Sequence, residues 1–366
     1  MATTATEGGP AGAGPRRARL LLVVLAAALS AWAVGRLAAA ELFSRFTAFD
    51  DAGYIMLSVR QVLEGHPLYD DVYSQYGPFY YLSRWLVLGL PGLEVTHDVT
   101  GLVTLGAWVL TSALLALGVW RMTGSLVFTV LTQLQTGVVL RRALYEPGHP
   151  NDLAAVLLAG LVVAAAGRRA SRGRAVALGA LVAALTLTKI NVGVFAGLGV
   201  LLAAGLAAPP GPLVAALRGL LSVLAVALPL VLMRQNLDLP ATFAYAISAS
   251  AAVLAALLVG RTAGAGDAEA ADARDETAGS AGFGGLVLGG LVVVAVTVAF
   301  VLLRGTSPGA LWKAVVVDPL LFPGRIHMPT ALVPGWSAAL AGSGVLLVAR
   351  ALTGGSARAW VIHARE

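Results

Sequence analysis

Apolar runs of roughly twenty residues recur along this 366-residue chain, and they restrict its fold more than any other feature. Hydrophobic residues make up 58% of the sequence and charged residues 12%, whereas a soluble domain carries about 25% charged residues. A helix of about twenty residues is long enough to cross a hydrocarbon core about 30 Å thick. The sequence therefore predicts an integral membrane protein with an all-α fold, a polytopic bundle of transmembrane helices.

About ten spans are predicted, with boundaries that vary by several residues. They are placed at residues 20–34, 99–120, 125–140, 151–167, 175–188, 191–208, 213–233, 241–260, 283–303 and 331–350. For residues 175–208 the alternative is one long tilted helix followed by a re-entrant segment. For the first run the alternative is a cleavable signal peptide, because alanines 38–40 offer small residues for cleavage. Since Arg36 interrupts the approach to that site, we expect a retained first span.

The arginines predict how the spans are oriented. Basic residues next to membrane helices favour the cytoplasmic side, and residues 168–174 hold four arginines in one short loop. We therefore expect a multi-pass protein of the cytoplasmic (inner) membrane with a cytoplasmic N-terminus. The net charge of +6 is explained by this rule, so no nucleic-acid partner is expected.

The same orientation divides the chain into regions. Residues 1–15 are expected to be a disordered cytoplasmic tail, residues 16–351 a membrane domain and residues 352–366 a second cytoplasmic tail. Inside the membrane domain, residues 41–98 form the first outer loop and residues 264–282 a flexible cytoplasmic linker. Residues 79–90 are too short to span, and we expect an interfacial helix with Tyr80, Tyr81 and Trp85 at headgroup depth.

Composition also excludes some chemistry. The chain has no cysteine, so disulfides, thiolate metal sites and cysteine nucleophiles are excluded. Only Lys189 and Lys313 are lysines among 25 basic residues. The preference for arginine is attributed to a GC-rich genome, and it makes each lysine a residue of interest.

The first outer loop holds adjacent carboxylates, Asp50 and Asp51, just beyond the first span. Charged groups near the hydrocarbon edge are costly unless they are paired, hydrated or functional. Neighbouring acids raise each other's pKa, which suits a general base or a divalent-metal site. The alternative is a solvated cap of the helix that follows, whose apolar residues begin at Tyr54.

The same loop continues with Tyr69-Asp70-Asp71 and Tyr76-Gly77-Pro78-Phe-Tyr-Tyr. In this order, residues 50–81 resemble the first outer loop of superfamily C glycosyltransferases, polytopic enzymes that use lipid-phosphate-linked sugars. In that family an acid or acid pair follows the first span, and an amphipathic helix and a proline-containing aromatic stretch come next. This part of the resemblance covers one loop and points to the superfamily without indicating a subfamily.

The resemblance implies a hexosyl- or pentosyltransferase that moves a sugar from a polyprenyl-phosphate donor to a lipid, glycan or protein acceptor. Asp50 would be the catalytic carboxylate that deprotonates or orients the acceptor hydroxyl. Asp51 is the alternative, because the first acid of the family motif aligns with either residue. Family members usually invert the anomeric centre, and the reaction would take place at the outer face of the membrane.

A second outer loop, residues 141–152, contains Glu146, His149 and Asp152. Three such side chains within seven residues predict a divalent-metal site, for Mg²⁺ or Mn²⁺, and no other cofactor is expected. The alternative is a polar turn between spans, with Asn151 or Asp152 capping the helix that follows. The resemblance favours function, since family members often place a second acidic motif here.

Four further residues are predicted to bind the donor. Lys189 lies in a Thr-Lys-x-x-x-Gly segment similar to one near the donor phosphate in the superfamily, and lysine binds phosphate as a compact point charge. A snorkelling interfacial lysine is the alternative. Arg325 and His327, in the last outer loop, could close over an anionic headgroup or face anionic lipid, and Tyr76 belongs to the aromatic stretch.

Two other functions fit a chain of this kind. A transporter or a flippase of cell-envelope precursors also has many spans, although its charges would be expected at the bilayer midplane, whereas most charges here fall in the loops. A non-catalytic membrane scaffold is the second alternative. For the scaffold, the acidic and aromatic residues between Asp50 and Tyr81 would have no chemical role.

Overall fold

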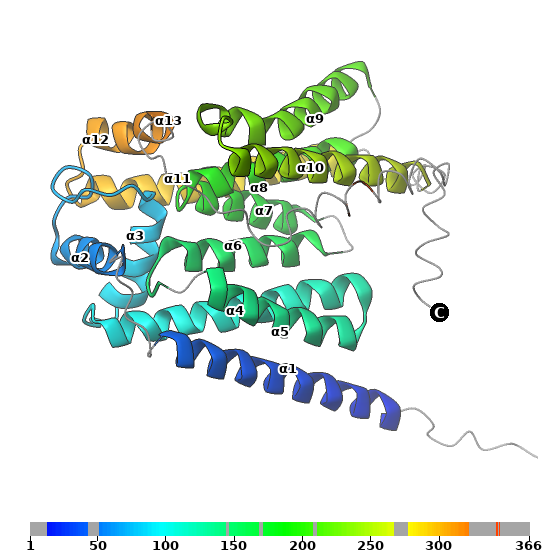
Figure 1. Ribbon diagram of the computed structural model, residues 1–366, viewed down its shortest axis with the longest axis horizontal. Helices are drawn as coiled ribbons and strands as arrows, with labels where there is room; N and C mark the ends of the chain where they lie inside the picture. The colour runs from blue at the N-terminus through cyan, green and yellow to red at the C-terminus, as the bar shows by residue number, and fades with distance from the viewer. Residues whose placement is uncertain are drawn as a thin grey trace, which may run out of the picture. The chain divides into compact units, whose positions relative to one another are not determined.

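The structure is a computed structural model that describes residues 13–42, 51–143, 146–167, 171–207, 211–266 and 277–321, together with residues 342 and 344. Within these ranges the regular elements are helices (Figure 1), and an isolated bridge pairs Leu68 with Val72. The all-α prediction is confirmed for this part of the chain. Two compact units divide it: unit 1 draws on Met1–His66 and Tyr80–Arg169, and unit 2 on Pro67–Phe79 and Ala170–Glu366.

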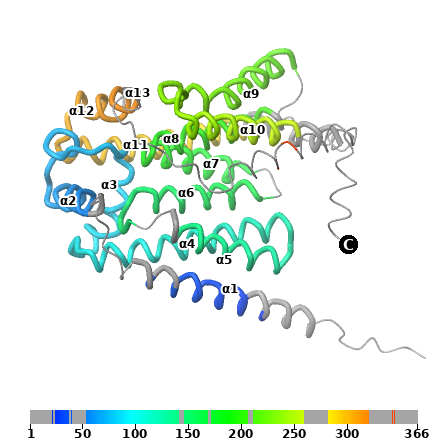
Figure 2. The backbone as a smooth tube through the Cα atoms, viewed as in Figure 1, coloured from blue at the N-terminus to red at the C-terminus, as the bar shows by residue number. Residues whose placement is uncertain are grey.

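Unit 1 is built around α4, a long apolar helix. Its helices are α1 (Ala13–Leu42), α2 (Asp51–Glu64), α3 (Pro78–Arg84, from Tyr80 onward), the π-helix η1 (Trp85–Gly89), α4 (His97–Thr123), α5 (Leu126–Ala143) and α6 (Pro150–Ala165). Helix α4 packs against α1, α5 and α6. Thr96 caps its first turn by accepting from the Val99 N–H, and Gly124, with a left-handed φ of 66°, ends it. The chain then turns directly back into α5 (Figure 2).

Unit 2 contains the remaining helices. They are α7 (Arg172–Thr186), α8 (Ile190–Ala207), α9 (Pro212–Leu232), the 3₁₀-helix η2 (Arg234–Asn236), α10 (Pro240–Gly266), α11 (Thr277–Leu303), α12 (Pro308–Trp312), the π-helix η4 (Lys313–Val317) and α13 (Asp318–Leu321). Helices α7 and α11 pack closely because glycines bring their backbones together. A Cβ on Gly179 would overlap the Leu286 carbonyl, and one on Gly289 would overlap the Val176 carbonyl. Small residues at helix contacts are typical of membrane bundles.

Four helical segments are long and apolar enough to cross a membrane: His97–Thr123, Pro212–Leu232, Pro240–Leu258 and Gly282–Leu303. They coincide with four of the predicted spans and suggest a multi-pass membrane protein. Helices also occupy the predicted spans at 125–140, 151–167, 175–188 and 191–208, but they are shorter. Residues 187–189 separate α7 from α8. The predicted span at 331–350 lies outside the described residues.

Three described helices extend into regions predicted to lack regular structure. Helix α1 begins at Ala13, within the tail predicted at residues 1–15. Helix α10 continues to Gly266 and α11 begins at Thr277, so both enter the linker predicted at residues 264–282.

Two of the aromatic residues predicted at headgroup depth are buried inside the protein. Tyr80 and Tyr81 lie in the interior of unit 1, and their rings meet edge to face with centroids 5.2 Å apart. The large apolar side chains exposed in this segment are Leu86, Val87 and Leu90. Tyrosine was assigned to the interface on its amphipathic character, but its hydroxyl has found a partner inside the protein.

Candidate functional site

Asp152 is a fully buried carboxylate, and unit 1 supplies hydrogen bonds to both of its oxygens. The Thr104 hydroxyl donates to Oδ2 at 2.9 Å, and the Trp108 indole N–H donates to Oδ1 at 3.0 Å. Thr104 and Trp108 stand one turn apart on α4, and Asp152 lies in the first turn of α6. Because an unpaired buried carboxylate would cost several kcal/mol, these donors fix how α4 meets α6.

The turn before α6 joins this carboxylate to other groups through Gly148. Its N–H donates to the Thr104 hydroxyl at 2.7 Å, and its carbonyl accepts from the Tyr80 hydroxyl at 2.5 Å and from Arg84 Nη2 at 3.4 Å. Glycine is required here twice over, since φ is +78° and a Cβ would meet the Thr100 methyl group. We call Tyr80, Arg84, Thr104, Trp108, Gly148 and Asp152 the Asp152 cluster.

The Asp152 cluster also holds a buried arginine. Arg84 is 6% exposed, and its guanidinium lies 4.9 Å from the centre of the Tyr80 ring and donates to the Gly148 carbonyl. Gly148 and Thr104 thus connect Arg84 to Asp152 through hydrogen bonds. Burial raises the pKa of Tyr80, which therefore stays a neutral hydroxyl and a hydrogen-bond donor. The cluster can hold a carboxylate and a guanidinium in fixed positions away from solvent.

Glu146, His149 and Asp152 do not form the predicted metal site. In the described part of the chain no group of three or more His, Asp or Glu side chains could hold a metal ion. His149 instead caps α6, with Nδ1 accepting from the Asn151 N–H at 3.0 Å, and both Asp152 oxygens accept from α4. The alternative of a polar turn that caps the next helix is closer to what the structure shows, although the capping residue is His149. The three residues do not fit a Mg²⁺ or Mn²⁺ site.

In unit 2 the predicted aromatic stretch and the predicted lysine segment lie together. The Gly77 N–H donates to the Thr188 carbonyl at 3.1 Å, and the Phe79 N–H donates to the Leu187 carbonyl at 3.0 Å. A Cβ on Gly77 would overlap the Leu187 carbonyl oxygen, so only glycine permits this approach. We call this the loop contact.

Two predicted donor-binding residues adjoin the loop contact. Lys189 follows Thr188 directly, and burial lowers the pKa of its ammonium group. Tyr76 precedes Gly77, is mostly buried and accepts the Tyr69 hydroxyl on its carbonyl at 2.7 Å. The structure therefore brings Tyr76 and Lys189 into neighbouring segments, which sequence reasoning had predicted separately.

Asp70, from the Tyr69-Asp70-Asp71 motif, anchors the segment of residues 67–79 within unit 2. Its carboxylate accepts from the Ser307 N–H at 2.6 Å and from the Ser307 hydroxyl at 2.8 Å. Next to it, the Thr306 hydroxyl donates to the Leu68 carbonyl at 2.9 Å. Asp70 thus ties the loop to the start of α12 and has a structural role.

The remaining predicted site residues are not all described. Asp50, Arg325 and His327 lie outside the described residues, and Asp51 is the first residue of α2, one turn before the buried Ile55. Sequence reasoning missed Arg84, Thr104 and Trp108. Two signals were available: Arg84 follows an aromatic stretch closely, and Thr104 and Trp108 continue a row of polar-capable side chains at helical spacing in an otherwise apolar segment.

Comparison with known proteins finds no counterpart: no protein-family model, curated protein or solved structure matches the chain.

Proposed function

We propose that this chain is a polytopic membrane glycosyltransferase of the superfamily C type, which transfers a sugar from a polyprenyl-phosphate donor to an acceptor at the outer face of the cytoplasmic membrane. Ten spans, a cytoplasmic N-terminus and an outer first loop belong to the proposal. The observation that carries it is the loop contact in unit 2. Two segments implicated by the resemblance, the aromatic stretch and the Thr-Lys segment, are hydrogen-bonded to each other through Gly77 and Thr188.

Lys189 is suited to the donor phosphate. Partial burial makes its ammonium group less hydrated, and a phosphate is an anion that can offset this cost. The segment is held rigidly, because the Gly77 and Phe79 amides bond to the two residues before Lys189. A rigid support for a phosphate-binding cation is what group transfer needs, since positioning supplies much of the catalysis.

Unit 1 by itself contains a cavity that could bind a small apolar group. A cavity of about 450 Å³ lies among α4, α5 and α6. Its lining is mainly apolar, with a few polar side chains: Thr111, Leu115, Thr132, Gln135, Thr136, Val139, Leu140, Ala155, Leu158, Ala159, Leu161 and Val162. This volume falls within the range of small-molecule sites.

The proposed reaction is a single displacement. The acceptor oxygen attacks the anomeric carbon while the bond from that carbon to the phosphate oxygen breaks, and the polyprenyl phosphate leaves with the bonding electrons. Asp50, or Asp51 as the alternative base, takes the acceptor's proton. Lys189 stabilises the negative charge that the leaving phosphate gains.

The proposal is tested by assaying membranes with radiolabelled polyprenyl-phosphate sugars, comparing the wild type with Asp50→Asn and Asp51→Asn. Loss of a general base should reduce turnover about 10²- to 10⁴-fold in the variant that lacks it, with unchanged expression. The less affected variant identifies the acid that is not the base. Asp71→Asn is a matched control, because it also replaces one loop carboxylate by its amide.

Full transfer activity in both single variants and in the double variant would remove the motif from the chemistry. If the wild type transfers no sugar but moves labelled lipid-linked sugars across proteoliposome membranes, the flippase alternative replaces the proposal.

A further inference from the structure

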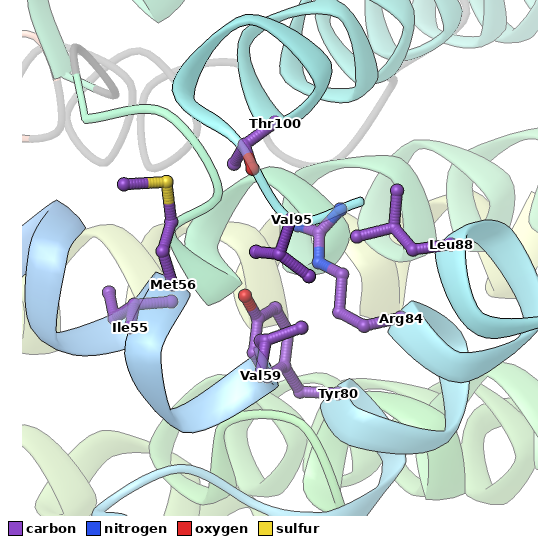
Figure 3. A pocket seen from close by; sticks show the side chains of 8 residues that line it. All are labelled: Ile55, Met56, Val59, Tyr80, Arg84, Leu88, Val95 and Thr100. Atoms are coloured by element: carbon purple, nitrogen blue, oxygen red, sulfur yellow. The ribbon is translucent and has the colours of Figure 1, made fainter. Parts of the chain in front are cut away.

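A small cavity lies in unit 1 between α2, α3 and the start of α4 (Figure 3). Its lining residues are Ile55, Met56, Val59, Tyr80, Arg84, Leu88, Val95 and Thr100. Its volume is about 10 Å³, measured as the space that the centre of a water molecule can occupy. That is close to the smallest volume that holds one water molecule, and it is too small for a sugar or a phosphate group.

Two polar atoms at this cavity have no hydrogen-bond partner among the described residues. They are Nε of Arg84 and the hydroxyl oxygen of Thr100, and the two side chains are 6% and 5% exposed. Figure 3 shows both side chains at the cavity, with the Thr100 oxygen directed toward Val95 and the Arg84 guanidinium. An orphaned buried donor or hydroxyl typically costs about 1–3 kcal/mol, so two at one cavity need an explanation.

Gly148 independently shows that these two side chains are close together. Arg84 Nη2 donates to the Gly148 carbonyl, and the Thr100 methyl group lies where a Cβ on Gly148 would be. Arg84 and Thr100 therefore flank the same residue from different helices. The cavity lies beside the Asp152 cluster and shares Tyr80 and Arg84 with it.

We propose that this cavity is a binding site for one water molecule, which accepts a hydrogen bond from Arg84 Nε–H and forms another with the Thr100 hydroxyl. Arginine can only donate, whereas a threonine hydroxyl donates or accepts, so a water molecule satisfies both. At about 10 Å³ the cavity has room for one water molecule but not for a phosphate group. The inference is independent of the proposed transferase activity.

The water would extend the Asp152 cluster by one member. With Nε satisfied, the guanidinium keeps its position over the Tyr80 ring and its bond to the Gly148 carbonyl. Helix α2, which contributes Ile55 and Val59 to the cavity wall, then closes over a fully hydrogen-bonded network. Asp51 begins the same helix, so the water supports the element that carries the candidate acid.

The test uses the sign of a stability change in the full-length protein purified in detergent. Thr100→Val keeps the shape of the side chain but removes the hydroxyl. If a water bridges Thr100 and Arg84, this change lowers Tm by about 2 °C, because a buried hydrogen bond is lost. If the cavity is dry, removing an unsatisfied hydroxyl leaves Tm unchanged or raises it, and the proposal is overturned.

Ser250→Ala is the matched control. Ser250 lies in α10 of unit 2, and its buried hydroxyl also lacks a partner among the described residues. Its removal should leave Tm unchanged or raise it, which calibrates the loss of an orphaned hydroxyl.

Coupling to Arg84 gives a second measurement. In an Arg84→Lys background, which keeps the charge but loses Nε–H, Thr100→Val should lower Tm by much less. An undiminished effect would show that Thr100 acts without Arg84. Chloride at constant ionic strength tests for an anion instead. If chloride raises the Tm of the wild type but not that of Thr100→Val, the cavity binds an anion and the water site is overturned.

Discussion

The Asp152 cluster in unit 1 is built mainly from side chains, whereas the loop contact in unit 2 is built from backbone groups. In the cluster, Thr104 and Trp108 use a hydroxyl and an indole N–H to hold one carboxylate. In the loop contact, the Gly77 and Phe79 amides donate to two carbonyls. The contact requires glycine at position 77, because any Cβ there would overlap the Leu187 carbonyl. The first arrangement fixes charges inside the protein, and the second fixes the position of a chain segment beside Lys189.

This difference determines how each region should respond to mutation. A side-chain network loses hydrogen bonds one at a time, so conservative changes should have graded effects. A backbone contact that leaves no space for a Cβ cannot adjust to a larger residue, so a small addition should break it entirely.

The largest effect is expected from Gly77→Ala. The new methyl group would overlap the Leu187 carbonyl and separate the loop from residues 187–188, with the loss of both backbone hydrogen bonds. We expect destabilisation of about 4 kcal/mol, from overpacking and two lost bonds together. Unfolding in mixed detergent micelles measures it. Gly199→Ala in α8, where a Cβ would meet nothing within 4 Å, is the control and should be neutral or stabilising. Equal stabilities of the two variants would contradict the loop contact.

Asp152→Asn should have the next largest effect. An amide nitrogen cannot accept a hydrogen bond, so it would face either the Thr104 hydroxyl or the Trp108 indole N–H and leave that donor without its acceptor. An unsatisfied buried group typically costs about 1–3 kcal/mol, so we expect a loss of about 2 kcal/mol in the same unfolding measurement.

Trp108→Phe separates the parts of this effect. It removes one donor but leaves the charges in place, so it should cost less than Asp152→Asn. Trp120→Phe, on the same helix, is its control. A neutral outcome for Asp152→Asn would mean that the carboxylate is not held as a charged group.

A smaller effect, on activity, is expected at Lys189. If the ammonium binds the donor phosphate, Lys189→Met should weaken donor use about tenfold, which corresponds to about 1.4 kcal/mol, without affecting stability. Lys189→Arg should retain part of the activity, because the charge is kept. Lys313→Met, at the other lysine, is the control.

The pH dependence of donor use provides a further check on Lys189. Burial lowers the pKa of this group, so the cation is present at low pH and is lost as pH rises through a value below that of an ordinary lysine. Donor use by the wild type should fall over that range, and Lys189→Arg should not show the fall. Wild-type donor use in the Lys189→Met variant would leave only the snorkelling interpretation.

The smallest effect is expected at Asp70. Its bonds to Ser307 are solvent-exposed, so Asp70→Ala should cost about 1 kcal/mol or less. Ser307→Ala removes the hydroxyl bond to Asp70 and the cap of α12 but keeps the backbone N–H bond, and the double variant should lose less than the sum of the two single losses. Additive losses in the double variant would show that the two residues act separately.

The sequence by itself determined where the helices lie and which polar residues were unusual. The apolar runs predicted α4, α9, α10 and α11, because a membrane requires about twenty consecutive apolar residues and few other sequences provide them. Asp152 was selected from sequence as one of three predicted metal ligands, and the structure gives it two hydrogen-bond donors instead. Tyr76 and Lys189 were likewise chosen from sequence, and their segments do meet.

Only the tertiary structure decided which residues those partners are. Helix α4 places Thr100, Thr104 and Thr111 on its buried side, so its sequence could indicate which face packs inside the protein but not which residue that face would contact. Thr104 and Trp108 lie more than forty residues from the carboxylate that they bind. Tyr80 is buried because the Gly148 carbonyl accepts its hydroxyl, and that carbonyl is positioned by a left-handed turn between two other helices. Such pairings depend on how the helices pack, a property that local sequence does not record.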